Sequence, residues 1–221
     1  MGFPVLVMGF SGSGKSSSLR NFSREEIGVF SVAGKRLPFR NNLKVANLER
    51  LKAEYAEKNV MFDPYQYIIS ALKASDKEAF AIDDSQYLMS FEEMDSTKTG
   101  FDKFNSIGFN FIGLVRAIRS QLPEDTIVYF LHHPEYDDNG RIKAKTIGKL
   151  IDNHFTLEGL FEVAILSEYD KGDYVFKTRT NGMTPLKNPP DMLPDTMPND
   201  LKLVDTLIRE YWQAPEGGDS E

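Results

Sequence analysis

The stretch Pro4-Val5-Leu6-Val7-Met8-Gly9-Phe10-Ser11-Gly12-Ser13-Gly14-Lys15-Ser16 decides how this chain folds. Its first five residues are continuously apolar, as in a strand buried on both faces of a parallel sheet. The segment that follows matches the pattern Gly-x-x-x-x-Gly-Lys-Ser, and residues 15–22 then read as a helix. A strand, a glycine-rich loop and a helix in this order form the context in which this pattern binds phosphate groups.

The chemistry of phosphate binding explains each residue type in this P-loop. Glycines let the backbone approach phosphates closely, so that N–H groups point inward, and the start of a helix adds a favourable dipole. Lys15 is expected to pair with the β- and γ-phosphates, and Ser16 to ligate Mg²⁺. A guanine-recognition motif is missing, which favours ATP over GTP. The residues expected to contact Mg-ATP are Gly9, Ser11, Gly12, Ser13, Gly14, Lys15, Ser16 and Ser17.

Two acids follow residues 79–82, a second short apolar run that reads as a buried strand. An acid that organises magnesium is expected at the end of a strand near the P-loop, and Asp83 has that position. We expect Asp83 to ligate the metal together with Ser16. Asp84 comes one residue later and is the candidate for polarising the attacking water. The structural alternatives are a strand-end cap for Asp83 and a turn residue for Asp84.

Adjacent histidines, His132 and His133, end the next expected strand at residues 126–131. P-loop ATPases commonly place a polar residue at this strand end, where it senses the γ-phosphate. Side chains of neighbouring strand residues diverge, so one histidine is expected to act as the sensor while the other packs or faces solvent. His132 is the candidate sensor, and a structural role is the alternative for either histidine.

The composition fits one globular domain. The chain has 221 residues, of which 41% are hydrophobic and 27% charged. No run reaches the roughly 18 apolar residues of a membrane span, and the apolar N-terminal run is interrupted by glycines, unlike a signal peptide. The chain has no cysteine, which excludes disulfides and thiolate chemistry and fits the cytoplasm. We expect a single domain over residues 1–213 and a disordered acidic tail over residues 214–221.

Strand and helix patterns alternate along most of the chain, which indicates an α/β fold with a mostly parallel central sheet flanked by helices. Two β-like runs around Asp170-Lys171-Gly172-Asp173 add an expected C-terminal hairpin. The remaining expected elements are a strand at 27–32, helices at 48–58, 65–74 and 100–122, hairpin strands at 161–169 and 174–180, a proline-rich extended loop at 188–198, and a closing amphipathic helix at 201–212.

Several local runs, with the two nucleotide motifs, resemble the small phage ATPases that have a RecA-like recombinase core. The resemblance covers residues 5–212 and rests on the runs Ser18-Leu19-Arg20-Asn21-Phe22, Val32-Ala33-Gly34-Lys35-Arg36-Leu37-Pro38-Phe39-Arg40, Asp137-Asp138-Asn139-Gly140-Arg141 and Lys145-Thr146-Ile147-Gly148-Lys149. That group is linked to single-strand annealing and homologous recombination. The resemblance implies a RecA-like ATPase in the host bacterial cytoplasm, a homo-oligomer or filament, and single-stranded DNA and a phage single-strand-binding protein as partners.

The hairpin carries a candidate for a contact between subunits. Lys177 and Arg179 are two residues apart, so both project from one face of a strand. In RecA-like and hexameric-helicase ATPases, a basic pair with this spacing reaches the γ-phosphate in the neighbouring subunit and stabilises the transition state. The resemblance therefore implies a catalytic role for Lys177 and Arg179 in an oligomer. A solvated strand face is the alternative.

A basic segment after the histidines is the candidate DNA site. RecA-like proteins place a DNA-binding loop after the sensor strand, and phosphate contacts there would make the affinity salt-dependent. The net charge of −7 argues against nonspecific binding by the whole surface. An ordinary solvated loop is the alternative. The candidate residues are Arg141, Lys143, Lys145 and Lys149, and a second basic stretch that assists them or forms an interface contains Lys35, Arg36, Arg40 and Lys44.

One departure from the RecA pattern concerns catalysis. RecA-type recombinases carry a catalytic glutamate on the strand after the P-loop helix, whereas residues 30–35 contain no acid. The role then falls to Asp84, or to Glu25 or Glu26, or turnover is slow. Two other functions remain open. One is a nucleoside or nucleotide kinase, which also begins with a P-loop, and the other is a nucleotide-gated interaction module that hydrolyses little ATP.

Overall fold

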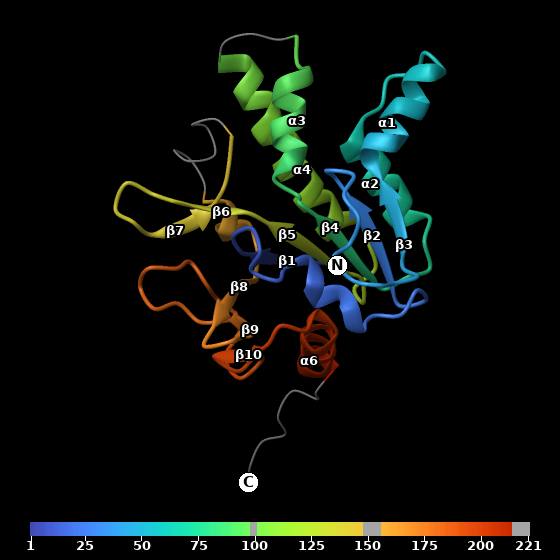
Figure 1. Cartoon of the computed structure of the whole chain (residues 1–221). Coiled ribbons are helices and arrows are strands. Elements are labelled where there is room, and N and C mark those ends of the chain that lie inside the picture. Colours follow the sequence, from blue (N-terminus) through green and yellow to red (C-terminus); the bar gives the residue numbers. More distant parts are fainter. Residues whose placement is uncertain (98–100, 148–155, 214–221) are drawn as a thin grey trace.

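A twisted sheet of eight strands runs through the centre of the protein (Figure 1). The computed structural model describes residues 1–97, 101–147 and 156–213, with the side chains of residues 101 and 102 excepted. The strand order is β10-β9-β8-β1-β5-β4-β2-β3. The expected α/β fold, with a mostly parallel sheet flanked by helices and a small antiparallel hairpin, is confirmed. The expected tail at residues 214–221 lies outside the described residues.

Six neighbouring strands are parallel, and their carboxyl ends meet at one edge of the sheet. In register, Met8 lies opposite His132, and Asp83 lies opposite both Leu131 and Ser31. The end of the P-loop strand, the acids and the histidines are therefore brought to the same edge. These strands are β3 (Lys44–Asn47), β2 (Ile27–Ser31), β4 (Ala79–Asp83), β5 (Ile127–His132), β1 (Phe3–Met8) and β8 (Val163–Asp170).

The antiparallel part continues the sheet beyond β8. Strand β9 (Asp173–Lys177) returns along β8, and β10 (Thr196–Pro198) closes the edge. The turn between β8 and β9 places Lys171 at a φ of 53° and Gly172 at 104°, as a tight hairpin turn requires. The predicted hairpin is confirmed, and its first strand is longer than β1, so it extends past the carboxyl end of β1.

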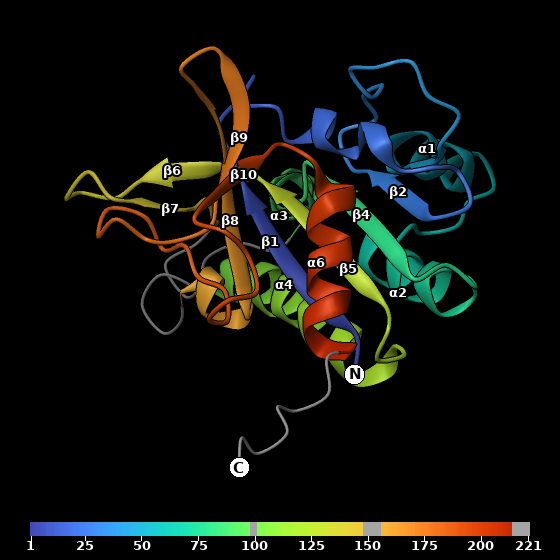
Figure 2. The same ribbon diagram turned by 90° about the horizontal axis from the view of Figure 1, so that it is seen from below.

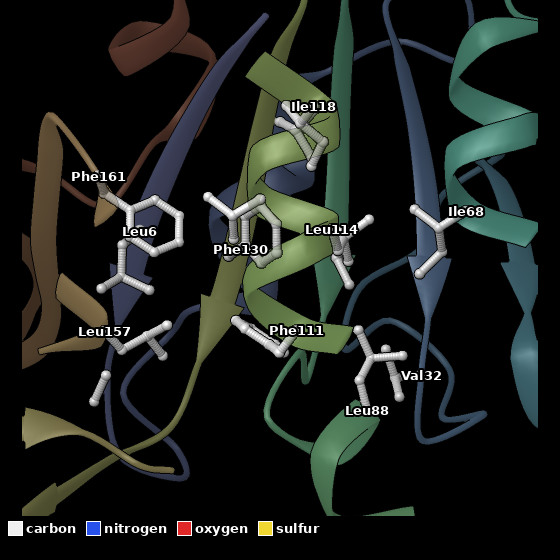
Figure 3. Close-up of a cluster of buried hydrophobic side chains, with 14 of the residues drawn as sticks. Leu6, Val32, Ile68, Leu88, Phe111, Leu114, Ile118, Phe130, Leu157 and Phe161 are labelled. Atoms are coloured by element: carbon white, nitrogen blue, oxygen red, sulfur yellow. The ribbon is translucent and has the colours of Figure 1, made fainter. Parts of the chain in front are cut away.

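Residues on alternate positions of the parallel strands pack into two separate layers. One layer, with Val5 and Tyr129, packs against α6 (Leu201–Gln213) and η1 (Ser16–Asn21). The other, with Leu6 and Phe130, packs against the remaining helices (Figure 3). Figure 2 shows α6 and α4 on opposite faces of the sheet. The helices of the second layer are α1 (Leu48–Glu57), α2 (Pro64–Lys73), α3 (Tyr87–Asp95), α4 (Phe101–Gln121) and η2 (Leu157–Leu160).

The helix after the P-loop differs from its prediction. The expected helix at residues 15–22 is a 3₁₀-helix, η1, of six residues. Three consecutive serines begin it, and the Ser18 hydroxyl donates to the carbonyl of Lys15, a local bond that competes with regular α-helix. The element after the P-loop is therefore shorter and more tightly wound than the expected helix.

Among the described residues, six elements were not predicted from the sequence. Strands β6 (Pro134–Tyr136) and β7 (Ile142–Ala144) form a separate antiparallel ribbon around the expected turn at Asp138-Asn139-Gly140. The others are β3, β10, α3 and η2. The strands have only three or four residues, too few for a periodic signal, and α3 has a weakly amphipathic sequence. No helix within the described ranges is long and apolar enough to cross a membrane.

Candidate functional site

The P-loop leaves the carboxyl end of β1 in a conformation that requires its glycines. Gly12 and Gly14 have φ values of 79° and 95°, which side chains other than glycine rarely adopt. At Gly9 the limit is space, because a Cβ atom there would lie 2.3 Å from the Ser13 hydroxyl and 2.7 Å from the Ser167 carbonyl oxygen. Residues with side chains at these positions would therefore force the loop out of its tight backbone conformation.

The loop presents backbone donors that the protein itself does not use. The N–H groups from Gly14 to Ser17 donate to no carbonyl or side chain among the described residues. The hydroxyl of Ser13 is buried and also has no partner in this part of the chain. Consecutive unpaired N–H groups in such a turn form a concave anion-binding surface. The unpaired N–H groups and the Ser13 hydroxyl are therefore suited to bind phosphate oxygens.

Lys15 is folded back on its own loop. Its ammonium donates to the carbonyl of Gly9 and, at 3.1 Å, to that of Phe10. Burial lowers the pKa of Lys15 to about 8, although the nearby Asp84 and Asp83 carboxylates oppose this shift. A buried cation that is hydrogen-bonded only to neutral carbonyls would be stabilised by a bound phosphate anion, because the opposite charge offsets part of the cost of burial.

Ser16 and Asp83 come together although they are 67 positions apart in the chain. The hydroxyl of Ser16 donates to Oδ1 of Asp83 at 2.8 Å. Burial raises the pKa of Asp83, while the bond from Ser16 opposes the shift and the Asp84 charge adds to it. A hydroxyl and a partly desolvated carboxylate side by side are hard oxygen ligands of the type that Mg²⁺ takes together with nucleotide phosphates. The expected metal ligands therefore fit the ion.

Asp84 is held by two cationic or polar partners from different segments. Lys35 Nζ lies 2.9 Å from Oδ2, and His133 Nε2 lies 3.2 Å from Oδ1. Burial alone would raise the pKa of Asp84, but the bonds from His133 and Lys35 outweigh burial and lower it to about 2. Asp84 also has a φ of 59°, a strained backbone conformation for a residue with a side chain. Asp84 is therefore ionised at neutral pH and suits hydrogen-bond acceptance better than proton abstraction.

The choice of His132 as sensor needs correction. His132 is fully buried on the α4 side of the sheet, where its ring centroid lies 5.8 Å from that of Phe111. Nε2 lies 2.7 Å from the Lys145 carbonyl, which can only accept, so Nε2 carries the proton and Nδ1 accepts from Ser85 at 2.9 Å. Both nitrogens are thus engaged in the interior. The histidine beside the acids is His133, as the divergence of neighbouring strand side chains allows.

Glu25 and Glu26, the alternative catalytic acids, lie at the wrong end of the sheet. They precede β2, so they are at its amino end, whereas the P-loop follows the carboxyl end of β1. Glu26 bonds to Lys202 at 2.7 Å instead. Near the place where RecA-type recombinases carry their glutamate, this chain has Lys35. The sequence predicts a role for Lys35 in DNA binding or an interface instead.

The hairpin cations are paired within their own chain. Lys177 lies 3.0 Å from Asp170 and 3.7 Å from Glu168, and the bond to Asp170 raises its pKa. Strand β9 ends at Lys177, so the expectation that Arg179 projects from the same strand face is wrong. Arg179 pairs with Asp195, and 47% of its side chain remains exposed. Within the described residues, neither side chain has an ion pair with the P-loop, and a role toward a neighbouring subunit stays a prediction.

The candidate DNA residues lie on the β6–β7 ribbon and just after it. Arg141 and Lys145 are exposed, and Lys143 lies 3.1 Å from Glu135. Lys149 lies outside the described residues. On the same ribbon, exposed Tyr136 stacks on Phe10 of the P-loop with ring centroids 5.2 Å apart. The ribbon and the P-loop are therefore in direct contact, a link that the sequence did not reveal.

Sequence reasoning also missed residues that support the loop from β8 and beyond. Ser167 donates to the Ser13 carbonyl at 2.7 Å, and Asn199 donates to Ser167 at 2.9 Å. The ring of Tyr174 lies over Gly14, 2.8 Å from the place of a Cβ atom. No motif marks these residues, because they meet the loop only through the pairing of β8 with β1.

Comparisons with known proteins assign this chain to no group: no model of a known protein family matches it, and no curated protein is detectably similar in sequence.

Proposed function

We propose that this protein is an ATPase with a RecA-like core that binds Mg-ATP at the P-loop. In this proposal it acts on single-stranded DNA as an oligomer, in recombination or strand annealing during phage replication. The single observation that carries nucleotide binding is the bond between Ser16 and Asp83, at 2.8 Å. These are the two residues that the sequence motifs assign, independently, to the same magnesium ion.

The strand order supports a RecA-like core. Strand β5 lies between β1, which carries the P-loop, and β4, which carries Asp83. The end of β5 is thus placed between the phosphate loop and the acids, where a residue such as His133 contacts Asp84. An intervening strand of this kind is what the resemblance to RecA-like ATPases requires for a γ-phosphate sensor.

The reaction proposed is hydrolysis of the terminal phosphate. Water attacks the γ-phosphorus, the bond to the β,γ-bridging oxygen breaks, and that oxygen leaves with ADP, while the water proton is transferred to an oxygen of the departing phosphate. The ammonium of Lys15 and the unpaired amides of Gly14–Ser17 are placed to neutralise charge that spreads over the phosphate oxygens. A bound Mg²⁺ would be held by Ser16 and Asp83 and would supply further neutralisation of the phosphate charge.

Asp84 is the chain's candidate for orienting the water. Both of its carboxylate oxygens already accept bonds, from Lys35 and from His133. Each carboxylate oxygen can accept a second bond, so Asp84 can hold a water molecule as well. We infer that Lys35 and His133 compete with water for Asp84, and that turnover is slow while both remain bonded.

Replacing Lys15 tests nucleotide binding. Lys15→Ala should abolish ATP binding in calorimetry and phosphate release, while circular dichroism stays unchanged because the lysine is a buried charge that costs the empty fold stability. Lys44→Ala, at an exposed lysine that begins β3, is the matched control. Unchanged ATP binding by Lys15→Ala would overturn the proposal.

DNA binding and assembly need a separate test. Light scattering after size exclusion, with ATP and a short oligonucleotide added in turn, should show a larger species with both ligands. Arg141→Ala with Lys145→Ala should reduce the slope of log affinity against log salt by roughly 1–2 for single strands. The double variant Arg50→Ala/Lys58→Ala, on α1 and at its end, is the control. Phosphate release that DNA does not stimulate would remove DNA from the proposal.

A kinase is the second candidate, because a hollow of suitable size for a second substrate is lined in part by Val32, the residue that follows β2. It measures about 660 Å³ and is lined by apolar side chains that include Val32, Phe62, Leu88 and Phe91. The backbone N–H of Val32 donates to the carbonyl of Asp83 at 3.2 Å, so the wall of the hollow continues into the acid strand. A phosphorylated product from added nucleosides or nucleotides would favour this function over the ATPase.

A further inference from the structure

Two exposed tyrosines face each other on the β8–β9 hairpin. Tyr169 and Tyr174 are direct partners across the two strands, and their ring centroids lie 5.0 Å apart at an interplanar angle of 58°. Tyr169 is 63% exposed and Tyr174 47%. Core packing does not explain two large rings left in solvent side by side, since each buries only part of its surface.

This tyrosine pair is fixed against the P-loop. Tyr174 lies over Gly14, at 2.8 Å from the position that a Cβ atom would take. The Ser167 hydroxyl bonds the carbonyl of Ser13, and the N–H of Asn199 donates to the carbonyl of Tyr174 at 3.2 Å. Strand pairing and these hydrogen bonds therefore hold the ring at the mouth of the loop, where it needs no rearrangement to receive a ligand.

The tyrosine pair and the acids lie on opposite sides of β1. Asp83 and His133 belong to β4 and the end of β5, on one side of β1, whereas β8 lies on the other side. Ser16 and Asp83 mark the β- and γ-phosphate end of a bound nucleotide. With the γ-phosphate beside these residues, as in the proposed function, the ribose and base lie farther from the acids, and the tyrosine pair lies across β1 from the acids.

We propose that Tyr174, supported by Tyr169, is the surface on which the base of the bound nucleotide stacks. This inference rests on the proposed nucleotide binding at the P-loop and adds the group that recognises the base. An aromatic face stacks on any nucleobase, so the site favours nucleotides over inorganic polyphosphate and discriminates weakly between adenine and guanine.

The test compares ATP, GTP and inorganic tripolyphosphate, which carries the phosphates without a base. In calorimetry, Tyr174→Ala should weaken ATP and GTP about tenfold or more and leave tripolyphosphate unchanged. Tyr174→Phe keeps the ring and should keep ATP affinity. Trp212→Ala, at an exposed aromatic ring that lies beside Phe3 at the other end of β1, is the control and should bind ATP like the wild type.

Each outcome bears on a different claim. Equal losses for ATP and tripolyphosphate in Tyr174→Ala would mean that the ring only shapes the loop at Gly14, and would overturn stacking. Unchanged ATP affinity in Tyr174→Ala would overturn it as well. If wild-type protein binds neither ligand in a manner that Lys15→Ala abolishes, the proposed function itself fails, and the stacking site fails with it.

Discussion

The ammonium of Lys35 lies 2.9 Å from Oδ2 of Asp84, and this bond joins the loop after β2 to the strand end that carries both acids. The Lys35 side chain is 62% exposed, whereas that of Asp84 is only 11% exposed. A solvent-exposed cation therefore covers one oxygen of the carboxylate that we propose orients water. Such an ion pair is weak enough to be exchanged when a ligand with negative charge approaches.

Removing Lys35 should expose Asp84. In Lys35→Ala, Oδ2 of Asp84 becomes available to water, and the pKa of Asp84 rises from about 2 toward its ordinary value. We expect DNA-independent phosphate release to rise, by roughly two- to fivefold, since a carboxylate without a competing cation accepts a hydrogen bond from water more readily and holds it more strongly. The measurement is steady-state phosphate release, with Arg36→Ala at the exposed neighbouring residue as the control. A tenfold decrease would instead mean that Lys35 itself contacts phosphate.

Asp83→Asn should separate metal binding from folding. The amide can still accept the bond from Ser16 but lacks the charge that attracts Mg²⁺, so we expect turnover to fall at least a hundredfold and ATP affinity to lose its dependence on magnesium. Because burial raises the pKa of Asp83, its ionised form at neutral pH costs the empty protein stability. The variant should therefore unfold at a higher temperature in the absence of ligands. A lower unfolding temperature together with intact magnesium dependence would contradict this assignment.

His132 should make the protein sensitive to acid. Burial lowers its pKa from 6.5 to about 4, so between these values the unfolded chain binds a proton that the folded protein does not. The free energy of unfolding is therefore unaffected by this group above about pH 6.5. It falls as the pH drops toward 4, and protonation of His132 in the unfolded chain accounts for roughly 3 kcal/mol of the loss. Urea unfolding at pH 7, 5.5 and 4.5 measures the loss. His132→Gln should flatten the slope over this range, and an unchanged slope would place the titration elsewhere.

Mixing two inactive variants tests whether Arg179 acts on a neighbour. Arg179→Ala retains a complete P-loop, and Lys15→Ala retains the arginine, so an oligomer that contains both has one site with all of its groups. We expect each variant alone to lose phosphate release by a factor on the order of 10³ and the mixture to recover a fraction of the wild-type rate. Normal hydrolysis by Arg179→Ala as a dilute monomer, or no recovery on mixing, would refute the contact between subunits.

The sequence predicted the parallel part of the sheet because those strands are short, continuous apolar runs separated by helical periodicity. The runs at Ala79–Asp83 and Ile127–His132 were placed within a residue or so. The ribbon of β6 and β7 was predicted only as a polar segment with a turn. Its strands have three residues each and pair with one another outside the main sheet, so neither length nor alternation could reveal them.

Part of the site was predictable because its residues follow strands that are recognisable in the sequence. Ser16 and Asp83 belong to local patterns, each anchored to a buried strand, and the parallel register of the sheet then brings them to hydrogen-bond distance. The histidines show the limit of this reasoning. Alternation along a strand requires His132 and His133 to diverge, but which of them faces the acids depends on which face of β5 meets α4.

Sequence alone determined the phosphate loop of this protein, from Gly9 to Ser16, because the backbone path and the lysine are specified within a few neighbouring residues. Only the tertiary structure decided what surrounds the loop: Lys35 on Asp84, Tyr174 over Gly14, and Tyr136 on Phe10. Those contacts join segments that are distant along the chain. Their geometry is set by strand order and by which strands extend beyond β1, which no local pattern of residues encodes.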